Sequence, residues 1–252
     1  MHSNASMFWR HATTSALLIG LSFVSSVPLF VPLTASADEI LSPTECKHES
    51  QDCIRKALQN YARTNKTNLG YDGARQAMFQ KVDVYVNHQG ERVVKCVYSS
   101  DEFPVGAGIP NNGVNTEHTW PQTFLRKAGT IGEGKSDLYH LFPTEMKING
   151  MRGSYPFKEC HFNRDTQGSL CQSNGFEPPE GHKGVVARAM FYMSVLYGMK
   201  IDDRQEQTLR EWSDTHPVES YEIERAEKIK AVQGNRNPFI DHPEWIVLVS
   251  DF

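Results

Sequence analysis

The common zinc-site patterns are missing from this sequence. No Cys-x-x-Cys or His-Glu-x-x-His pattern occurs in its 252 residues, which leaves little support for a zinc site. The loop from Gly106 to Gly113 is rich in glycine, proline and asparagine, and it lacks the Gly-Lys-Ser/Thr that ends a nucleotide-binding P-loop. No internal repeat and no long linker divides the chain. Another kind of motif must therefore carry the chemistry.

The amino-terminal segment lacks an uninterrupted apolar run long enough to cross a membrane. After Arg10, the apolar stretch over residues 16–33 is broken by serines and by Pro28, and Ala-Ser-Ala follows at 35–37. This pattern predicts a secretory signal over residues 1–37, with Met7 as an alternative start. A single mature domain over residues 38–252 is then expected in the periplasm or the medium. A retained membrane anchor is the alternative, and the interruptions disfavour it.

Positive charge is also in short supply. The chain has 26 lysine and arginine residues against 30 aspartate and glutamate residues. Because Arg10 is the only one of these residues in the predicted signal, the mature chain of 215 residues has a formal net charge of −5. One domain with a well-buried core can occupy this length.

Only five cysteines are present, and all of them follow the predicted signal. They would meet an oxidising compartment, in which disulfides persist. Cys160 and Cys171 enclose a polar loop and are the favoured pair, and Cys46 with Cys53 is a second possible pair. Cys96 would then be unpaired, although a bond from Cys96 to Cys46 or to Cys53 stays open.

Hydrophobic periodicity predicts a mixture of helices and strands. Apolar residues recur at helical spacing over 53–61, a short helix is expected over 72–79, and a helix over 223–232 ends at Gly234. Alternation over 82–86 and 92–98, around a turn at 87–90, predicts a β-hairpin beside the site. Residues 183–197 are apolar on nearly every side and predict the central buried helix, because a membrane span would be longer and would lack Arg188.

Three neighbouring stretches hold the candidate chemistry. They are residues 114–122 with Asn-Thr-Glu-His-Thr-Trp-Pro-Gln, residues 135–143 with Ser-Asp-Leu-Tyr-His-Leu-Phe-Pro, and residues 146–153 with Ile-Asn-Gly-Met-Arg-Gly. Together they supply a carboxylate, an imidazole, a carboxamide and a guanidinium. These groups are suited to metal-assisted attack on a phosphodiester.

Glu117 and His118 are the centre of this set. A neutral imidazole can take a proton from water near neutral pH, since its unperturbed pKa is ~6.5. A hard cation such as Mg²⁺ binds oxygen donors, and Glu117 and Asn149 are donors of that kind. On extended chain the side chains of Glu117 and His118 would diverge, so the strand would have to bend for one to face the metal and the other the water. Pro121 is consistent with such an interrupted strand.

The second and third stretches predict a strand followed by a helix. Residues 138–142 are short and apolar, Pro143 closes them, and Thr144 is placed to cap a helix that runs through residues 145–151 and stops near Gly153. The order of strand, connection, strand and helix would bring Asn149 across from Glu117.

These stretches, together with Gln-Gly-Asn-Arg-Asn-Pro-Phe-Ile-Asp-His-Pro at 233–243, resemble the bacterial endonuclease I family of periplasmic and extracellular nucleases. The resemblance runs from about residue 69 to residue 245. It implies an α+β fold with a ββα-metal (His-Me finger) core, additional helices and a small antiparallel sheet. It also implies Mg²⁺-dependent cleavage of DNA, and often RNA, with little sequence preference and 5′-phosphate products. On this basis His118 is the general base, while Glu117 and Asn149 bind one metal ion.

The resemblance further implies an arginine on the scissile phosphate. The family spacing does not transfer cleanly to this residue, so Arg152 and Arg126 are both candidates, and Arg152 is taken as the catalytic one. Arg152 has an ordinary alternative as a charge near a helix C-terminus, where the helix dipole favours it. Asn149, which precedes Gly150, has an alternative as a helix end.

Two further features lie close to the motifs. His140 follows an apolar stretch and is interpreted as a packed histidine rather than a ligand. Residues 235–242 predict a hydrogen-bonded structural loop beside the site, with contact between Arg236 and phosphate as the alternative. An acidic protein that handles a polyanion must gather its cations locally. The candidates for such a face are Arg126, Lys127, Lys135, Lys147, Arg152 and Lys158.

The sequence therefore predicts a secreted, monomeric, Mg²⁺-dependent nuclease without stable membrane association after signal cleavage. DNA is the expected substrate and RNA a further one, and Mn²⁺ or Ca²⁺ are candidate substitutes for Mg²⁺. A ribonuclease of the same fold is one alternative. A non-catalytic nucleic-acid-binding protein is another, and the presence of Glu117, His118 and Asn149 disfavours it.

Overall fold

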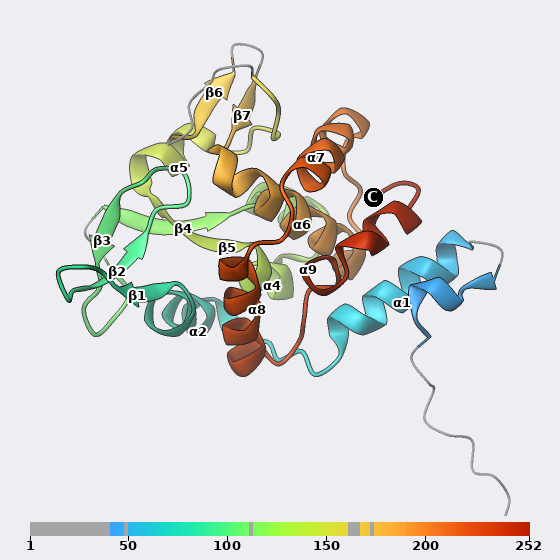
Figure 1. Ribbon diagram of the computed structural model, residues 1–252, viewed down its shortest axis with the longest axis horizontal. Helices are drawn as coiled ribbons and strands as arrows, with labels where there is room; N and C mark the ends of the chain where they lie inside the picture. Colours follow the sequence, from blue (N-terminus) through green and yellow to red (C-terminus); the bar gives the residue numbers. More distant parts are fainter. Residues whose placement is uncertain (1–40, 48–49, 111–112, 161–166, 172–173) are drawn as a thin grey trace, which may run out of the picture. The chain divides into compact units, whose positions relative to one another are not determined.

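Helix α6 (Glu180–Tyr197) forms the centre of the fold, and Figure 1 shows other helices arranged around it. Residues 182–196 of this helix are all buried, which fits a helix that is apolar on nearly every side. Helices α1 (Gln51–Arg63), α7 (Asp203–Thr215) and α9 (Pro238–Asp241) pack against it. The predicted central helix is confirmed, and it begins earlier than expected because Pro179 provides its N-cap.

The structure is a computed structural model, and it describes residues 41–47, 50–110, 113–160, 167–171 and 174–252. The predicted signal over residues 1–37 lies outside these ranges and stays a prediction. Within them, no helix is long and apolar enough to cross a membrane. The remaining helical elements are η1 (Pro43–Glu45), α2 (Gly70–Ala77), η3 (Met78–Val82), α3 (Gln122–Lys127), α4 (Ile131–Gly134), η4 (Leu138–His140), α5 (Met146–Arg152), α8 (Ser220–Gln233) and η5 (Pro243–Leu248).

In the described part of the chain, helices combine with three small antiparallel sheets, in agreement with the predicted α+β class. The predicted hairpin is present as β1 (Val84–Val86) and β2 (Arg92–Lys95), and the Asn87 side chain accepts hydrogen bonds from two backbone N–H groups in its turn. A third strand, β3 (Glu102–Pro104), was not predicted and pairs with β2. β2 ends at Lys95 rather than at Tyr98, because the chain turns there and the Cys96 N–H donates to Asp101 O.

Strands β4 (Val114–His118) and β5 (Leu141–Glu145) form the antiparallel pair that carries the candidate site. The sequence predicted a strand over 138–142, and this prediction is wrong for its first part. Leu138–His140 forms the 3-10 turn η4, which the Asp137 side chain caps by accepting from Tyr139 N. β5 therefore starts at Leu141 and continues through Pro143, whose carbonyl accepts a hydrogen bond from Val97 N.

Helix α5 follows β5 directly and packs on both strands of the pair. Thr144 does not cap it, contrary to the prediction, because Thr144 lies within β5 opposite Asn115. Glu145 is the N-cap residue and its side chain makes no capping bond. Strand, strand and helix nevertheless follow one another in the predicted order.

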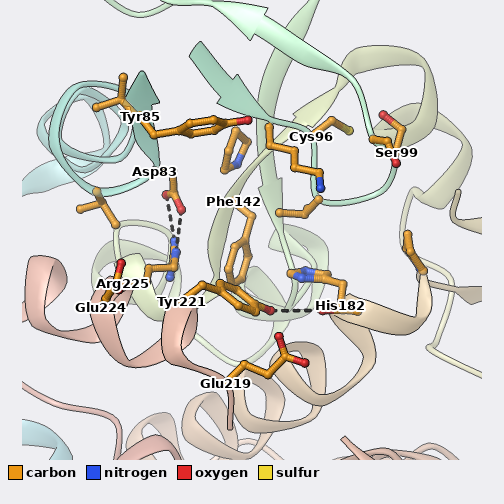
Figure 2. A pocket seen from close by; sticks show the side chains of 18 of the residues that line it. Asp83, Tyr85, Cys96, Ser99, Phe142, His182, Glu219, Tyr221, Glu224 and Arg225 are labelled. Atoms are coloured by element: carbon orange, nitrogen blue, oxygen red, sulfur yellow. Dashed lines mark hydrogen bonds and ion pairs between the residues drawn. The ribbon is translucent and has the colours of Figure 1, made fainter. Parts of the chain in front are cut away.

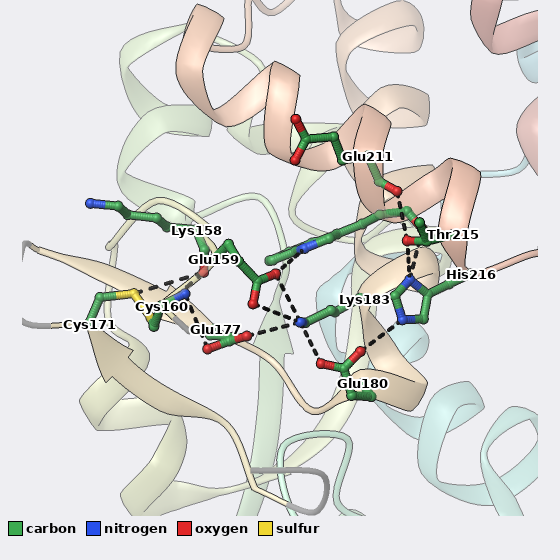
Figure 3. A network of polar contacts seen from close by, with 11 residues as sticks. Lys158, Glu159, Cys160, Cys171, Glu177, Glu180, Lys183, Glu211, Thr215 and His216 are labelled. Atoms are coloured by element: carbon green, nitrogen blue, oxygen red, sulfur yellow. Dashed lines mark hydrogen bonds and ion pairs between the residues drawn. A yellow bond between two sulfur atoms is a disulfide. The ribbon is translucent and has the colours of Figure 1, made fainter. Parts of the chain in front are cut away.

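Both predicted disulfides are present, as Cys46–Cys53 and Cys160–Cys171, and Cys96 is free and buried. The Cys160–Cys171 bond connects the segment before the hairpin of β6 (Ser169–Cys171) and β7 (Gly175–Glu177) to β6 itself. Figure 3 shows this bond next to Lys183 at the start of α6. The buried Lys183 Nζ lies within 3.0 Å of carboxylate oxygens of Glu159, Glu177 and Glu180, so it fixes the hairpin to the helix.

The helix predicted over 223–232 is confirmed as α8, which is longer than predicted at both ends. α8 ends at Gly234, as predicted, with a positive φ of 92°. A Cβ at residue 234 would collide with the backbone oxygen of Asn65, so glycine is needed there for space as well as for its conformation. The loop predicted over 235–242 contains the short helix α9, and its Asn235 amide donates to Ala62 O and Tyr192 OH.

A buried carboxylate, Asp137, connects α6 to the segment between β4 and β5. Its Oδ2 accepts hydrogen bonds from the hydroxyls of Tyr192 and Tyr197, each at 2.9 Å. Its Oδ1 accepts from Tyr139 N and from the Gln233 amide. All of these partners are donors, so the network satisfies a group that would be costly to bury alone.

We expect Asp137→Asn to lower the free energy of unfolding by about 3 kcal/mol, because an NH₂ group would then face donors and the buried network would lose its charge. Guanidinium unfolding measures this loss. Asp251→Asn is the control, since the Asp251 carboxylate is exposed and pairs with the exposed Lys200. It should leave the unfolding midpoint unchanged. Equal effects of the two substitutions would contradict the importance of the Asp137 network.

Candidate active site

Glu117 and His118 lie next to each other on β4 and point to opposite faces of the strand. β4 shows no break between them, and the pairing continues beyond the strand, because Thr119 N donates to His140 O. The side chains therefore diverge, as expected for extended chain. The bend considered for this strand is not present, so Glu117 and His118 face opposite sides of β4. Both are buried, with 2% of Glu117 and 6% of His118 exposed.

The Glu117 carboxylate is held by one hydrogen bond and one ion pair from other elements. Its Oε1 accepts a hydrogen bond of 2.9 Å from the Tyr98 hydroxyl and lies 3.3 Å from Arg152 Nε. Burial raises the pKa of Glu117, while Arg152 and the Tyr98 hydroxyl act in the opposite direction. A carboxylate has about four lone-pair positions, so capacity for a cation remains.

Asn149 and Arg152 are one turn apart on α5 and both face β4. Asn149 Nδ2 donates to Asn115 Oδ1 at 2.7 Å and to Thr116 O at 3.1 Å. The backbone oxygen can only accept, which fixes the orientation of the amide. Asn149 Oδ1 therefore points away from these partners and is available as an oxygen ligand.

Arg152 is almost completely buried, with 1% of its surface exposed. Besides its ion pair with Glu117, it donates to the carbonyl oxygens of Thr119 and Gly153, and its guanidinium lies 4.6 Å from the centre of the Phe157 ring. Arg126, the other candidate for the phosphate, lies on α3 and is exposed. In this structure Arg152 orients Glu117, and its predicted contact with phosphate stays a prediction.

His118 is oriented through both ring nitrogens. Its Nε2 lies 3.2 Å from Lys135 O, and its Nδ1 lies 3.3 Å from the Gln122 amide nitrogen. Since a carbonyl oxygen can only accept, Nε2 carries the proton, and the unprotonated Nδ1 accepts a hydrogen bond from the Gln122 amide. Burial lowers the pKa of His118 well below its ordinary value, and the neighbouring His140 adds to this effect. The ring is therefore neutral at neutral pH, with Nδ1 as the proton acceptor.

His140 is fully buried, in line with its interpretation as a packed histidine. Its Nε2 donates to Gly134 O at 2.6 Å, and its ring meets that of His118 edge to face with centres 5.4 Å apart. Burial lowers the pKa of His140 to about 4, so the imidazole that packs against His118 is neutral at neutral pH.

A family model of Endonuclease I matches residues 44–244 of this sequence. The chain belongs to the Endonuclease I family. This confirms the predicted family and, with it, the predicted enzyme class, a nuclease.

Named relatives of this Endonuclease I chain include enzymes for both nucleic acids. An extracellular ribonuclease of Bacillus subtilis (strain 168) is 33% identical over 154 residues, which are 52% of this chain and 52% of that protein. An extracellular ribonuclease of Bacillus amyloliquefaciens is 28% identical over 232 residues, 84% of this chain and 79% of that protein. An extracellular deoxyribonuclease of Aeromonas hydrophila is 31% identical over 178 residues, 62% of this chain and 78% of that protein. The match thus spans about half the length of the Bacillus subtilis relative.

The oxygen donors of this Endonuclease I site suit a hard cation. Glu117 supplies a carboxylate and Asn149 a free amide oxygen, and Mg²⁺ binds through one or two such groups while it keeps waters and substrate oxygens. Among the residues that the structure describes, no group of three or more histidine, cysteine, aspartate or glutamate side chains could hold a metal. The donor set therefore fits an ion that relies on few protein ligands.

Two cations lie on the His118 side of β4: Lys135, which is one of the candidates for the basic face, and Arg75, which sequence reasoning missed. The Tyr71 ring lies 5.5 Å from the His118 ring, between centres. Lys135 Nζ lies 3.8 Å from the centre of the Tyr71 ring, and the Arg75 guanidinium lies 5.5 Å from it. Neither cation has an ion-pair partner among the described residues. The spacing of four between Tyr71 and Arg75 was the available signal, since it places them on one face of a helix.

Residues 129–136 of this chain match the spacing of a P-loop, with Gly-Lys-Ser at 134–136. That motif requires a strand before it and a helix after it. Here α3 precedes the segment and η4 follows it. Its observed role is to present Lys135 O to His118 and Gly134 O to His140.

The tautomer of His118 can be measured directly. We expect ¹⁵N NMR of the metal-free protein to show a neutral His118 ring with its proton on Nε2, because Lys135 O accepts from that nitrogen. His140 should give the same tautomer and is an internal reference. A proton on Nδ1 of His118 would contradict the assignment of that nitrogen as the acceptor.

Proposed function

We propose that this Endonuclease I chain is a secreted, metal-dependent nuclease that hydrolyses phosphodiester bonds in DNA and RNA with little sequence preference. The observation that carries the proposal is the orientation of His118, whose Nε2 donates to a carbonyl oxygen and whose Nδ1 is an unprotonated acceptor that receives the Gln122 amide. Ribonucleases and deoxyribonucleases among the relatives support action on both polymers.

His118 acts as the general base in this proposal. Its Nδ1 takes a proton from a water molecule, and the water oxygen attacks phosphorus. The bond from phosphorus to the 3′ oxygen breaks, the 3′ oxygen leaves and takes up a proton from solvent, and the phosphate stays on the 5′ side of the downstream nucleotide. The Gln122 amide lies 3.3 Å from Nδ1, so the attacking water replaces this contact and accepts a hydrogen bond from the amide instead.

Glu117 and Asn149 hold the metal in this proposal, with Mg²⁺ as the expected ion and Mn²⁺ or Ca²⁺ as substitutes. When bound, the ion would stabilise the negative charge that develops on the phosphate and on the departing oxygen. Tyr98 and Arg152 keep Glu117 ionised and oriented in its buried position. A second role for Arg152, direct contact with the scissile phosphate, would require its guanidinium to become accessible, since only 1% of the residue is exposed.

Arg75 and Lys135 are better placed to bind phosphate. Both are half-buried beside Tyr71, and both lie on the side of β4 to which His118 points. Arg75 Nε is 3.4 Å from Thr116 Oγ1, so β4 also limits its movement. Fixed cations next to the base would compensate for the acidic net charge of the whole chain.

Secretion is part of the same proposal. The signal predicted over residues 1–37, the two disulfides and the extracellular or periplasmic relatives all support it. The mature enzyme is proposed to act as a monomer in the periplasm or the medium.

His118→Ala should lower the rate of cleavage of plasmid DNA and of total RNA by roughly 10²–10⁴-fold at saturating Mg²⁺, because the water loses its base. EDTA should stop the wild-type enzyme. Glu117→Ala is the comparison, since it should raise the Mg²⁺ concentration needed for activity. A fully active His118→Ala protein would contradict the assignment of His118 as the base. Cleavage in the presence of EDTA would contradict the proposed metal dependence.

Arg75→Met and Lys135→Met should each lower kcat/KM for nucleic acid by roughly 10–100-fold, because each removes a charged contact with phosphate. Lys135→Met keeps the backbone carbonyl that orients His118, so it tests the ammonium alone. Lys127→Met on α3 is the matched control, since it removes an exposed cation with the same change in net charge. If all three substitutions had the same effect, the contribution would be general electrostatics and not a phosphate site.

A further inference from the structure

A second cavity, separate from the site above, opens beside β5. It has a volume of about 550 Å³ and is lined by β1, β2, β5, the first turn of α6 and the start of α8. Its lining includes none of the residues Glu117, His118 and Asn149. This volume lies within the usual range for a small-molecule site. Nothing in the proposed reaction uses it.

Two tyrosines border this cavity and remain exposed. Tyr85 of β1 is 38% exposed and Tyr221 of α8 is 43% exposed. Figure 2 shows them on opposite sides of the pocket, with Phe142 between them. Each is held through its hydroxyl, because Tyr85 donates to Glu102 and Tyr221 donates to Gly181 O. Fixed aromatic rings at an open cavity offer surfaces for a flat ligand to stack on.

The floor of the cavity carries no free charge. Phe142 is covered by the Arg225 guanidinium at 4.1 Å and by the His182 ring at 4.9 Å. Arg225 is itself occupied, because it pairs with Asp83 and donates to the carbonyl oxygens of Leu138 and Leu141. The lining thus favours an uncharged ring over a buried anion.

Charged groups are found where the lining is exposed. Lys95 and Lys228 contribute two ammonium groups, and Glu219 and Glu224 contribute two carboxylates. Lys228 Nζ donates to Val82 O, and Lys95 has no ion-pair partner among the described residues. A ligand with an uncharged ring inside and a phosphate outside would match this distribution.

The cavity is connected to the candidate active site through two residues. Phe142 is the direct cross-strand partner of Glu117 in the β4–β5 pair. Tyr98 donates to Glu117, and its ring lies 5.8 Å from that of His182, which lines the cavity. Directly paired residues point to the same face of a sheet, so the floor of the cavity and the carboxylate share one face of the strand pair.

We propose that this pocket binds an unstacked nucleobase, with Tyr85 and Tyr221 as stacking surfaces. The proposal rests on the proposed nuclease function, which supplies ligands of this chemistry. The base can belong to a single strand held at the active site or to a released nucleotide. In the first case the pocket favours single-stranded segments, because a base within a duplex is not free to enter it.

Titration of the metal-free, oxidised protein with adenosine, followed by NMR, tests binding without any need for cleavage. Adenosine should bind, and ribose 5-phosphate, which has no base, should not. Tyr221→Ala and Tyr85→Ala should each weaken adenosine binding on the order of tenfold. Ile223→Ala is the control, because Ile223 lies on the same helix, is similarly exposed and does not line the pocket. Absence of adenosine binding in the folded protein, or equal binding of ribose 5-phosphate, would overturn the proposal.

Cleavage of a single-stranded oligonucleotide distinguishes the two sources of the base. If the strand supplies it, Tyr221→Ala should lower kcat/KM on the order of tenfold, and this difference should vanish on a strand with abasic sites around the cleavable bond. Binding of adenosine without any effect of Tyr221→Ala on cleavage would assign the pocket to released nucleotides and overturn the strand source. If wild-type protein cleaves neither strand, the proposed nuclease function fails, whereas the adenosine titration still decides the pocket.

Discussion

The Glu117 carboxylate is buried away from water, and contacts from the surrounding structure replace its lost hydration. Tyr98 and Arg152 supply the contacts, and removal of one partner from a buried ion pair typically costs several kcal/mol. Tyr98 comes from the turn after β2, and Arg152 comes from the last turn of α5. The carboxylate therefore connects the first sheet and α5 to β4. The same position of α5 brings Asn149 over Thr116.

The two faces of β4 have different tasks. One face carries Glu117 with the residues that keep it ionised, and the other carries His118 with the carbonyl that sets its tautomer. The polar groups on the Glu117 face are already paired with one another, while Arg75 and Lys135 on the His118 face have no carboxylate partner. This asymmetry explains how a chain with more acidic than basic residues can present positive charge to a phosphate. On the Glu117 face, only the Asn149 Oδ1 and the remaining lone pairs of Glu117 are left without a protein donor.

Much of the fold could be predicted, because its signals are local. The apolar run of α6, the alternation of β1 and β2, the glycine after α8 and the closely spaced cysteine pairs each lie within a few residues. The shift of β5 was not predicted, since the side chain of Asp137 favours a capped turn over a strand. α7 was missed because its sequence is mainly polar, and only Leu209, Trp212 and Glu206 are buried.

The candidate site was predictable only in part. Glu117, His118 and Asn149 lie within short motifs. In the structure Asn149 of α5 contacts β4, the strand that carries Glu117. Tyr71 and Arg75 reach the site from α2, and Tyr98 reaches it from the turn after β2. The spacing of Tyr71 and Arg75 places them on one helix face, but no local pattern indicates that this face meets β4. The burial of Arg152 likewise depends on Phe157 and on Thr119, which lie on either side of it in the sequence.

The free thiol of Cys96 has a consequence for oxidative folding after export. Each disulfide joins cysteines only 7 or 11 residues apart, and such short loops close at low entropic cost. Cys96 is protected from exchange with them only once it is buried against Thr144 and Glu145 of β5. Correct pairing therefore depends on how early β2 and β5 meet. Tyr98, two residues after this thiol, donates to Glu117, so a chain with scrambled disulfides at Cys96 would lose this support of the buried carboxylate as well.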